Sequence, residues 1–182
     1  IFETVIKLIR KNGYNNVSIK KICKEANVTK GAFYHHFSKK EDIIIRLYKD
    51  VDDYYQVKVK PELENKNIIE QIHFFINQQI YCANNIKFDI VQQIYKSQID
   101  TVNSYIVSQK RPFYKMLLEI VKIGQKKNIL IKDLTPRELT NYILNFSRGI
   151  IYDWCLHNGN YDIEKKLNSS LNLFLKSIQK EK

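Results

Sequence analysis

The chain has 182 residues, enough for one sizeable domain or for two small ones that share a core. Its five Gly and three Pro leave few positions for the tight turns of a β-sandwich, and no run reaches the roughly 18 apolar residues of a membrane span. The net charge of +11 is uneven: residues 1–49 hold 11 Lys and Arg against 4 Asp and Glu, and the remainder holds 19 against 15. This distribution is typical of a phosphate-facing module joined to a more neutral body.

Apolar residues recur at three- and four-residue spacing along most of the chain, which predicts an all-α protein of about nine helices. The three cysteines, Cys23, Cys82 and Cys155, form no CxxC pair and are odd in number. A reducing, cytoplasmic compartment is therefore favoured over a disulfide framework.

The first quarter predicts short helices with explicit start and stop signals. The first helix ends at "KNGY", where Gly13 suits a left-handed C-terminal cap. Ser18 is expected to cap a second helix and Thr29 a third. Asn27 stands in the short turn between them and tolerates left-handed geometry. The second and third helices therefore form a helix-turn-helix candidate.

The fourth helix is expected to begin at "SKKE", a capping box in which Ser38 is the N-cap and the Glu41 side chain accepts a hydrogen bond from the Ser38 amide. It should run to about Lys60, because Pro61 should stop it. Longer helices are predicted at about 67–84, 88–95, 105–127, 135–158 and 162–179. A break is expected at Pro112 in the third of these.

The stretch "VTKGAFYHHF", residues 28–37, indicates a helix with two different faces. If Phe33 and Phe37 point inward, Gly31 and His35 point outward. The outward surface would then carry little bulk and be surrounded by hydrogen-bond donors. A recognition helix in a major groove needs such a surface for close approach to base edges and phosphates.

Two other uses of the adjacent histidines fit less well. His35 and His36 lie about 100° apart on a helix, so they cannot chelate one metal as an i,i+4 pair could. A catalytic histidine would want a nucleophile or an orienting carboxylate, and none is indicated. We interpret His36 as a half-buried residue beside Phe37, and His35 as a DNA contact.

The segment "SIKKICKEANVTKGAFYHHFSKKEDI", residues 18–43, resembles the DNA-binding motif of the TetR family of bacterial transcriptional regulators. Asn27 departs from the glycine usual in the turn, and Cys23 from the common alanine, but both are physically tolerable. The resemblance implies a helix-turn-helix DNA-binding domain over residues 1–48. It also implies a helical ligand-binding and dimerisation domain over residues 49–182.

Carried over position by position, the resemblance assigns DNA contacts to eight residues. The expected phosphate contacts are Ser18, Thr29, Tyr34, His35 and Lys40. The residues expected nearest the bases are Lys30, Gly31 and Ala32.

The resemblance also implies that the last two helices pack against their copies in a homodimer. The expected interface residues are Leu139, Tyr142, Phe146, Ile150, Leu167, Leu171, Phe174 and Ile178. The same stripes also fit the core of a single chain, and the helix from Thr135 is apolar on more than one side, so it can serve both.

An effector site is expected among middle-helix residues that combine apolar bulk with a polar tip. The residues expected there are Tyr81, Phe88, Tyr95, Tyr105, Phe113, Met116, Tyr142 and Trp154. Each one alone also fits the core, but together they predict a pocket for a flat or lipophilic small molecule. No cofactor or metal motif appears, and no polar constellation indicates an enzyme.

The sequence thus predicts a cytoplasmic, homodimeric, TetR-like repressor that binds a palindromic double-stranded operator and is released by a small hydrophobic or aromatic effector. The rival interpretation is an architectural or chromosome-organising DNA-binding protein, without an inducer, whose helical body binds a protein partner. A body that encloses no cavity would favour the rival.

Overall fold

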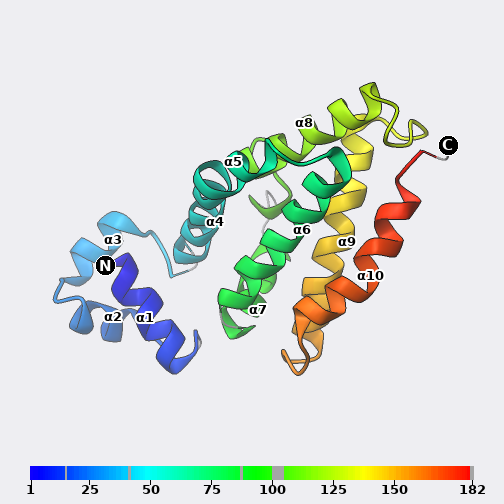
Figure 1. Cartoon of the computed structure of the whole chain (residues 1–182). Helices are drawn as coiled ribbons and strands as arrows, with labels where there is room; N and C mark the ends of the chain where they lie inside the picture. Colours follow the sequence, from blue (N-terminus) through cyan, green and yellow to red (C-terminus); the bar gives the residue numbers. More distant parts are fainter. Residues whose placement is uncertain (15, 41, 87, 100–104, 181–182) are drawn as a thin grey trace.

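The chain folds into helices that form a small N-terminal group beside a larger body (Figure 1). The computed structural model describes residues 1–14, 16–40, 42–86, 88–99 and 105–180. The α-helices are α1 (Phe2–Asn12), α2 (Ile19–Glu25), α3 (Lys30–His36), α4 (Asp42–Tyr54), α5 (Lys60–Leu63), α6 (Ile68–Asn85), α7 (Phe88–Ile99), α8 (Pro112–Lys126), α9 (Pro136–Leu156) and α10 (Ile163–Ser177). A π-helical turn, η1 (Tyr55–Val59), joins α4 to α5, and a 3₁₀ turn, η2 (Tyr105–Val107), precedes α8. The all-α prediction is confirmed.

The short N-terminal helices begin where their capping residues predicted. The Ser18 hydroxyl accepts a hydrogen bond from the Lys21 amide at 3.2 Å, and the Thr29 hydroxyl accepts one from the Ala32 amide at 3.1 Å. Asn27, between α2 and α3, has the left-handed backbone expected of it, with φ of 49°. These local contacts satisfy amides that a helix start otherwise leaves unpaired.

The body helices also follow their start signals. Thr135 and Glu138 form the predicted capping box of α9: the Thr135 amide donates to the Glu138 carboxylate at 2.8 Å, and the Glu138 amide donates to the Thr135 hydroxyl at 3.3 Å. Pro112 stands in the first turn of α8, so the predicted break lies there. A proline is tolerated in a first turn because its missing N–H would be unpaired anyway.

Two expectations about the fourth helix are wrong. The helix begins at Asp42 rather than Ser38, and the Asp42 carboxylate accepts a hydrogen bond from the Lys39 amide at 3.1 Å. The predicted partner Glu41 lies outside the described residues. Pro61 does not end the helix, because it follows the π turn. The amide of Lys60 there bonds to the carbonyl of Tyr55, which shifts the hydrogen-bond register ahead of the proline.

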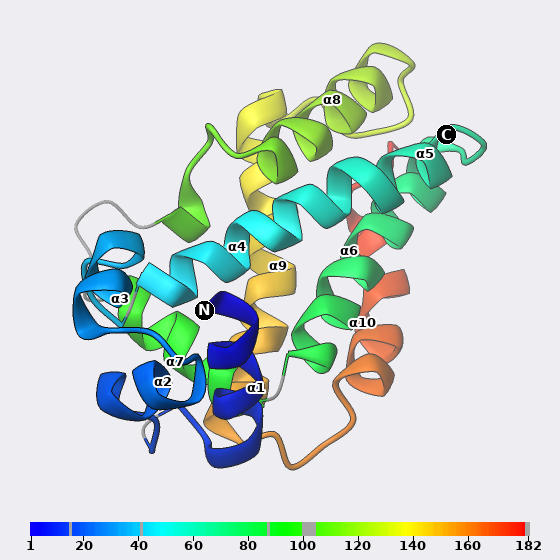
Figure 2. The same ribbon diagram turned by 90° about the vertical axis from the view of Figure 1, so that its left-hand side faces the viewer.

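Two apolar cores meet along α4 and α7. Ile43 and Leu47 of α4 pack into the N-terminal core, whereas Tyr55, directly after α4, packs into the core of the body. On α7, Ile94 belongs to the N-terminal core and Val91 to that of the body. Figure 2 shows α4 running from the N-terminal helices across the body. A movement of α4 would therefore change the packing of both the N-terminal core and the core of the body.

Candidate DNA interface and effector cavity

The outer face of α3 is open and carries little bulk. Gly31 is exposed, and a Cβ built there would meet only the Thr29 hydroxyl, at 3.7 Å. Lys30 and His35 are exposed, and Tyr34 keeps 51% of its surface exposed. This face can approach a surface closely while offering hydrogen-bond donors.

The inner face of α3 holds the helix in place. Phe33 is fully buried, and its ring meets that of Tyr34 edge-on, with centroids 5.5 Å apart. Of the other residues assigned to DNA contact, Ser18 and Thr29 are exposed and Ala32 is partly buried. The predicted division of α3 into an inward aromatic face and an outward small and polar face is confirmed.

Lys40 lies in the turn after α3 and is held against the end of α1. Its ammonium donates to the carbonyl oxygen of Tyr14 and lies 3.8 Å from the centroid of the Tyr14 ring. The contact with phosphate expected of Lys40 stays a prediction. Through its contacts with Tyr14, Lys40 holds the turn after α3 against the end of α1.

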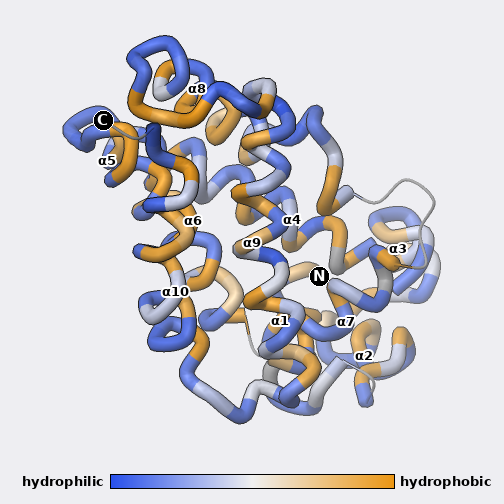
Figure 3. The backbone as a smooth tube through the Cα atoms, turned by 90° about the vertical axis from the view of Figure 1, so that its right-hand side faces the viewer, coloured by the Kyte–Doolittle hydropathy of each residue, from blue (hydrophilic) through white to orange (hydrophobic). Residues whose placement is uncertain are grey.

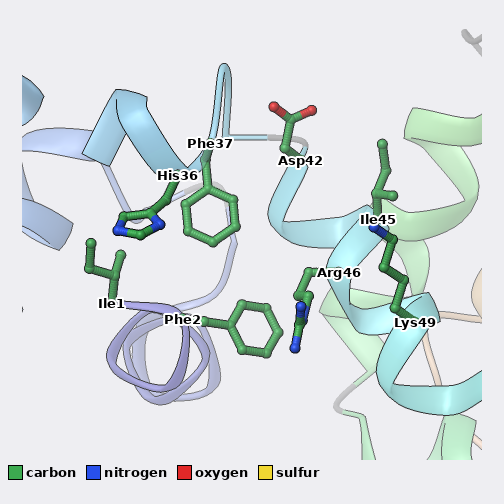
Figure 4. Close-up of a pocket in the computed structure, with 8 residues that line it drawn as sticks. All are labelled: Ile1, Phe2, His36, Phe37, Asp42, Ile45, Arg46 and Lys49. Carbon is green, nitrogen blue, oxygen red and sulfur yellow. The ribbon is translucent and has the colours of Figure 1, made fainter. Parts of the chain in front are cut away.

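His36 is exposed, so the interpretation as a half-buried residue is wrong. Its backbone lies at the end of α3, where the helix stops and the side chain can turn outward. It lines an open groove of about 580 Å³ between α1, α3 and α4 (Figure 4). In this groove the rings of Phe2 and Phe37 are 6.5 Å apart, and the Arg46 guanidinium lies 5.9 Å from the ring of Phe2. These contacts join α1 and α3 to the start of α4.

The body contains a small, half-open cavity of about 70 Å³, which we call the inner cavity. Its walls come from α4, α6, α7, α8 and α9, with residues near η2. The lining residues are Tyr48, Val51, Gln79, Cys82, Ala83, Ile86, Val91, Ile94, Tyr95, Ile106, Arg111, Phe113, Arg148 and Ile151. Tyr95 and Phe113 are the two residues of the predicted effector set that line it.

The other predicted effector residues lie elsewhere. Tyr81 lines an open groove of about 420 Å³ between α1, α4 and α6, which we call the outer groove. Phe88 and Trp154 pack edge-on against each other, 5.9 Å apart. Tyr105 donates a hydrogen bond to the Asp52 carboxylate at 2.9 Å. Tyr142 and Met116 do not line either space: Tyr142 is 47% exposed, and Met116 packs on the core.

The sequence analysis did not predict the charged residues of the inner cavity. Arg111 forms a buried ion pair with Asp52 of α4, with its Nη2 3.0 Å and its Nε 3.2 Å from Oδ1. Arg148 of α9 donates to the carbonyl oxygen of Ile106 at 2.9 Å. One signal was available: the chain has only 5 Arg against 25 Lys, and Arg148 stands between Phe146 and Ile150 on an otherwise largely apolar helix. Arginine in such a setting indicates a planar, multi-donor role.

The expected dimer residues divide into two groups. Leu139, Leu167, Leu171 and Ile178 are fully buried in the body core, so they have no surface left for a partner chain. Phe146 and Ile150 are partly exposed, and the Phe146 ring stacks on that of Phe174 at 4.0 Å. Periodicity alone cannot separate a core stripe from an interface stripe on helices that are apolar on more than one side.

The exposed apolar face of α9 and α10 lies beside these residues. Tyr142 is 47% exposed and Leu173 is 73% exposed, and a Cβ built at Gly149 would meet nothing within 4 Å. Hydrophilic and hydrophobic positions alternate along α10 in Figure 3, as expected of a helix with one buried face. We call Tyr142, Phe146, Gly149, Ile150 and Leu173 the outer α9–α10 face.

Two of the three cysteines, Cys82 and Cys155, carry no sign of reactivity. Burial raises the pKa of Cys82 to about 12 and that of Cys155 to about 11, so both thiols stay protonated near neutral pH. Within the described residues, no group of three or more His, Cys, Asp or Glu is placed to hold a metal ion. No helix there is long and apolar enough to cross a membrane.

Two family patterns together account for most of the chain. Residues 1–47 match the pattern described as "Bacterial regulatory proteins, tetR family", and residues 51–177 match "YsiA-like protein, C-terminal region". The second match alone covers more than two thirds of the 182 residues.

Similar proteins extend over the whole length. The chain is 24% identical over 181 residues to the fatty acid metabolism regulator protein of Bacillus subtilis, covering 98% of this chain and 93% of that one. The structure resembles the transcriptional regulator FadR of B. subtilis in complex with stearoyl-CoA, with a TM-score of 0.67 at 21% identity and 97% coverage of each chain. It also resembles the fatty acid degradation regulator FadR of Bacillus halodurans, with a TM-score of 0.72 at 19% identity, covering 96% of this chain and 95% of that one. At these identities the likeness to the solved structures shows a shared fold.

Proposed function

Because this chain belongs to the TetR family of bacterial regulatory proteins, we propose that it acts as a homodimeric repressor that a small-molecule effector releases from a palindromic operator. The observation that carries this proposal is the outer face of α3. It combines an open Gly31 with exposed Lys30, Tyr34 and His35 on a helix whose other face is buried.

The contacts fall into two kinds in this proposal. Ser18, Thr29, Tyr34, His35 and Lys40 hold the phosphate backbone, and Lys30, Gly31 and Ala32 lie against base edges. Phosphate contacts fix the register of the protein on the duplex, whereas base contacts supply the sequence specificity. A dimer places two copies of α3 in successive major grooves, about 34–36 Å apart.

The inner cavity supports an effector-responsive regulator over the architectural rival. Its walls include Tyr48 and Val51 of α4, the helix that carries residues of both cores. An effector that binds better when α4 is tilted would shift the population toward dimers whose recognition helices no longer match the operator. The stearoyl-CoA bound by FadR of B. subtilis makes an effector with a long apolar part the natural candidate.

Operator binding should depend strongly on salt. If six to eight phosphates are neutralised per dimer, affinity should fall on the order of 10³-fold between about 50 and 200 mM salt. The operator would first be selected from a random duplex library with the full chain, and affinities would then be measured by fluorescence anisotropy. A flat salt response would rule out this contact surface.

A pair of tyrosine variants tests whether loss of a hydroxyl on α3 weakens DNA binding more than loss of an exposed hydroxyl elsewhere. Tyr34→Phe removes one exposed hydroxyl from α3 and should weaken binding to all duplex sequences alike. Tyr152→Phe removes a comparably exposed hydroxyl from α9, since Tyr152 is 45% and Tyr34 51% exposed, and should leave DNA affinity unchanged. Equal affinities for the two variants would show that Tyr34 does not hold phosphate.

A further inference from the structure

The inner cavity has an unbalanced charge. Two guanidinium groups, those of Arg111 and Arg148, line it. The Asp52 carboxylate pairs with Arg111, which accounts for one of the two positive charges. Within the described residues, no carboxylate lies within ion-pair distance of Arg148. One positive charge therefore remains without a counter-ion beside an apolar space.

Arg148 is costly to hold there without an anion. Its side chain is partly buried, and the hydrogen bond to the Ile106 carbonyl uses one of its five N–H groups. Burial lowers the pKa of Arg148, and the neighbouring charge of Arg111 lowers it further, although three nearby tyrosines, Tyr48, Tyr95 and Tyr114, oppose the shift. A partly buried guanidinium without a counter-ion is less well solvated than in water, and a bound anion would stabilise it.

Tyr48 supplies a second unsatisfied polar group in the same cavity. Its side chain is only 9% exposed, and its hydroxyl has no hydrogen-bond partner within the described part of the chain. The ring is held in place by Tyr105, 5.9 Å away, and by the Arg111 guanidinium, 5.0 Å away. Tyr48 thus brings an unpaired buried hydroxyl to the residues that line the cavity, and buried hydroxyls are rarely left unpaired.

The inner cavity and the outer groove share three wall residues, Val51, Cys82 and Ile86. The inner cavity alone, at about 70 Å³, holds no more than a small head group. The outer groove, at about 420 Å³, is of the size that accommodates small molecules, and Phe2, Ile6 and Leu47 contribute apolar surface to it. Outward movement of the shared wall would join the two spaces.

We propose that the effector is an amphipathic monocarboxylate whose head group binds between Arg148 and Tyr48 and whose apolar chain passes the shared wall into the outer groove. This inference rests on the proposed function and names the chemical class of the effector. One carboxylate balances the one uncompensated guanidinium. Its two oxygens accept from the Arg148 fork and from the Tyr48 hydroxyl.

This placement links the effector to the DNA-binding part. The head group would bridge α9, through Arg148, and α4, through Tyr48. The chain would lie between α1 and α6 along α4, at the junction of the two cores. Filling the outer groove would move α1 relative to the body and so change the spacing of the two α3 helices.

The test compares ligands that differ only at the head group. The purified protein would be titrated by calorimetry with straight-chain fatty acids from hexanoate to octadecanoate, below their micellar concentrations. The matching alcohols and CoA thioesters would be titrated in parallel. At the best chain length, we expect the carboxylate to bind roughly 10- to 100-fold more tightly than the alcohol, as for a hydrogen bond to a charged group.

Variants then locate the head group. Arg148→Met should remove the preference for the carboxylate, whereas Arg148→Lys should keep part of it. Arg137→Met, the same change at an exposed arginine of α9, should leave binding unchanged. Tyr48→Phe should weaken carboxylate binding and raise the Tm of the ligand-free protein, because it removes an unpaired buried hydroxyl. Tyr48→Phe thus provides a test even if Arg148→Met fails to fold.

Several results would overturn this inference. They are binding of no fatty acid, equal binding of the alcohol, or tight binding of a CoA thioester that Arg148→Met does not weaken. If another compound then releases the protein from its operator, the proposed function stands and the proposed effector class is wrong. If nothing releases it and the salt response is flat, the proposed function itself fails.

Discussion

The buried ion pair between Asp52 and Arg111 ties the central helix to the rest of the body. Arg111 lies at the N-cap of α8, and its guanidinium is stacked about 5 Å from the rings of Tyr48, Tyr105 and Phe113. The Asp52 carboxylate also accepts the hydrogen bond of the Tyr105 hydroxyl. The pair therefore fixes the position of α4 against α8 and η2.

We expect Asp52→Asn to lower the free energy of unfolding by about 3–5 kcal/mol, because it leaves Arg111 charged and unpaired in the interior. Urea unfolding at fixed protein concentration measures this loss. Asp50→Asn is the matched control on the same helix: its pair with Arg46 is exposed, so about 1 kcal/mol or less is expected. Equal losses in the two variants would show that burial of the Asp52 pair does not matter.

At the scale of elements, most helix starts were predictable because a cap is decided within three or four residues. Thr135 and Glu138 contact each other across one turn, and Ser18 and Thr29 accept amides three residues ahead. The error at Pro61 arose where the chain departs from regular α geometry. The π turn carries the fourth helix past Pro61, and no residue pattern in the sequence marks it.

The start of α9 should respond to acid. Hydrogen bonds from the Thr135 hydroxyl and amide lower the pKa of Glu138 below its usual 4.5. The contribution of Glu138 to stability is therefore complete above pH 4.5 and is lost as the pH falls through the lowered pKa. We expect Glu138→Gln to flatten the acid side of the Tm profile below this pH.

Glu119→Gln, which removes one negative charge from the exposed surface of α8, controls for net charge. A Glu138→Gln profile that coincides with the parent profile throughout the acid range would contradict the role assigned to the capping box.

At the scale of the whole molecule, we propose that a second chain covers the outer α9–α10 face. Tyr142 and Leu173 are exposed apolar residues there, and Gly149 is open to solvent. In a single chain, a side chain at position 149 meets nothing within 4 Å and replaces a poor helix former. In a close helix-to-helix dimer, the same side chain would clash.

We therefore expect Gly149→Lys to keep the fold but shift the protein to monomers and to abolish operator binding. Sedimentation velocity and far-ultraviolet circular dichroism measure the two effects. Asn145→Lys, one turn earlier at an exposed position of α9, tests whether added charge alone is responsible. A Gly149→Lys protein that remains dimeric would exclude this face as the interface.

The sequence by itself determined the features that depend on neighbouring residues. These are the all-α class, the caps at Ser18, Thr29 and Thr135, and the inward and outward faces of α3. Capping hydrogen bonds and the 3.6-residue period of apolar side chains involve residues only a few positions apart, so they can be predicted without knowledge of the fold.

Two features depended on the tertiary structure alone: which residues line the inner cavity, and which apolar residues of α9 and α10 are buried. Tyr48 and Arg148 stand 100 positions apart and line one cavity only because α4 packs against α8 and α8 packs against α9. Leu139 and Tyr142 lie one turn apart on α9, yet the first is fully buried and the second is 47% exposed. Which apolar face turns inward depends on the helices that pack against it, and those contacts join residues far apart in the chain.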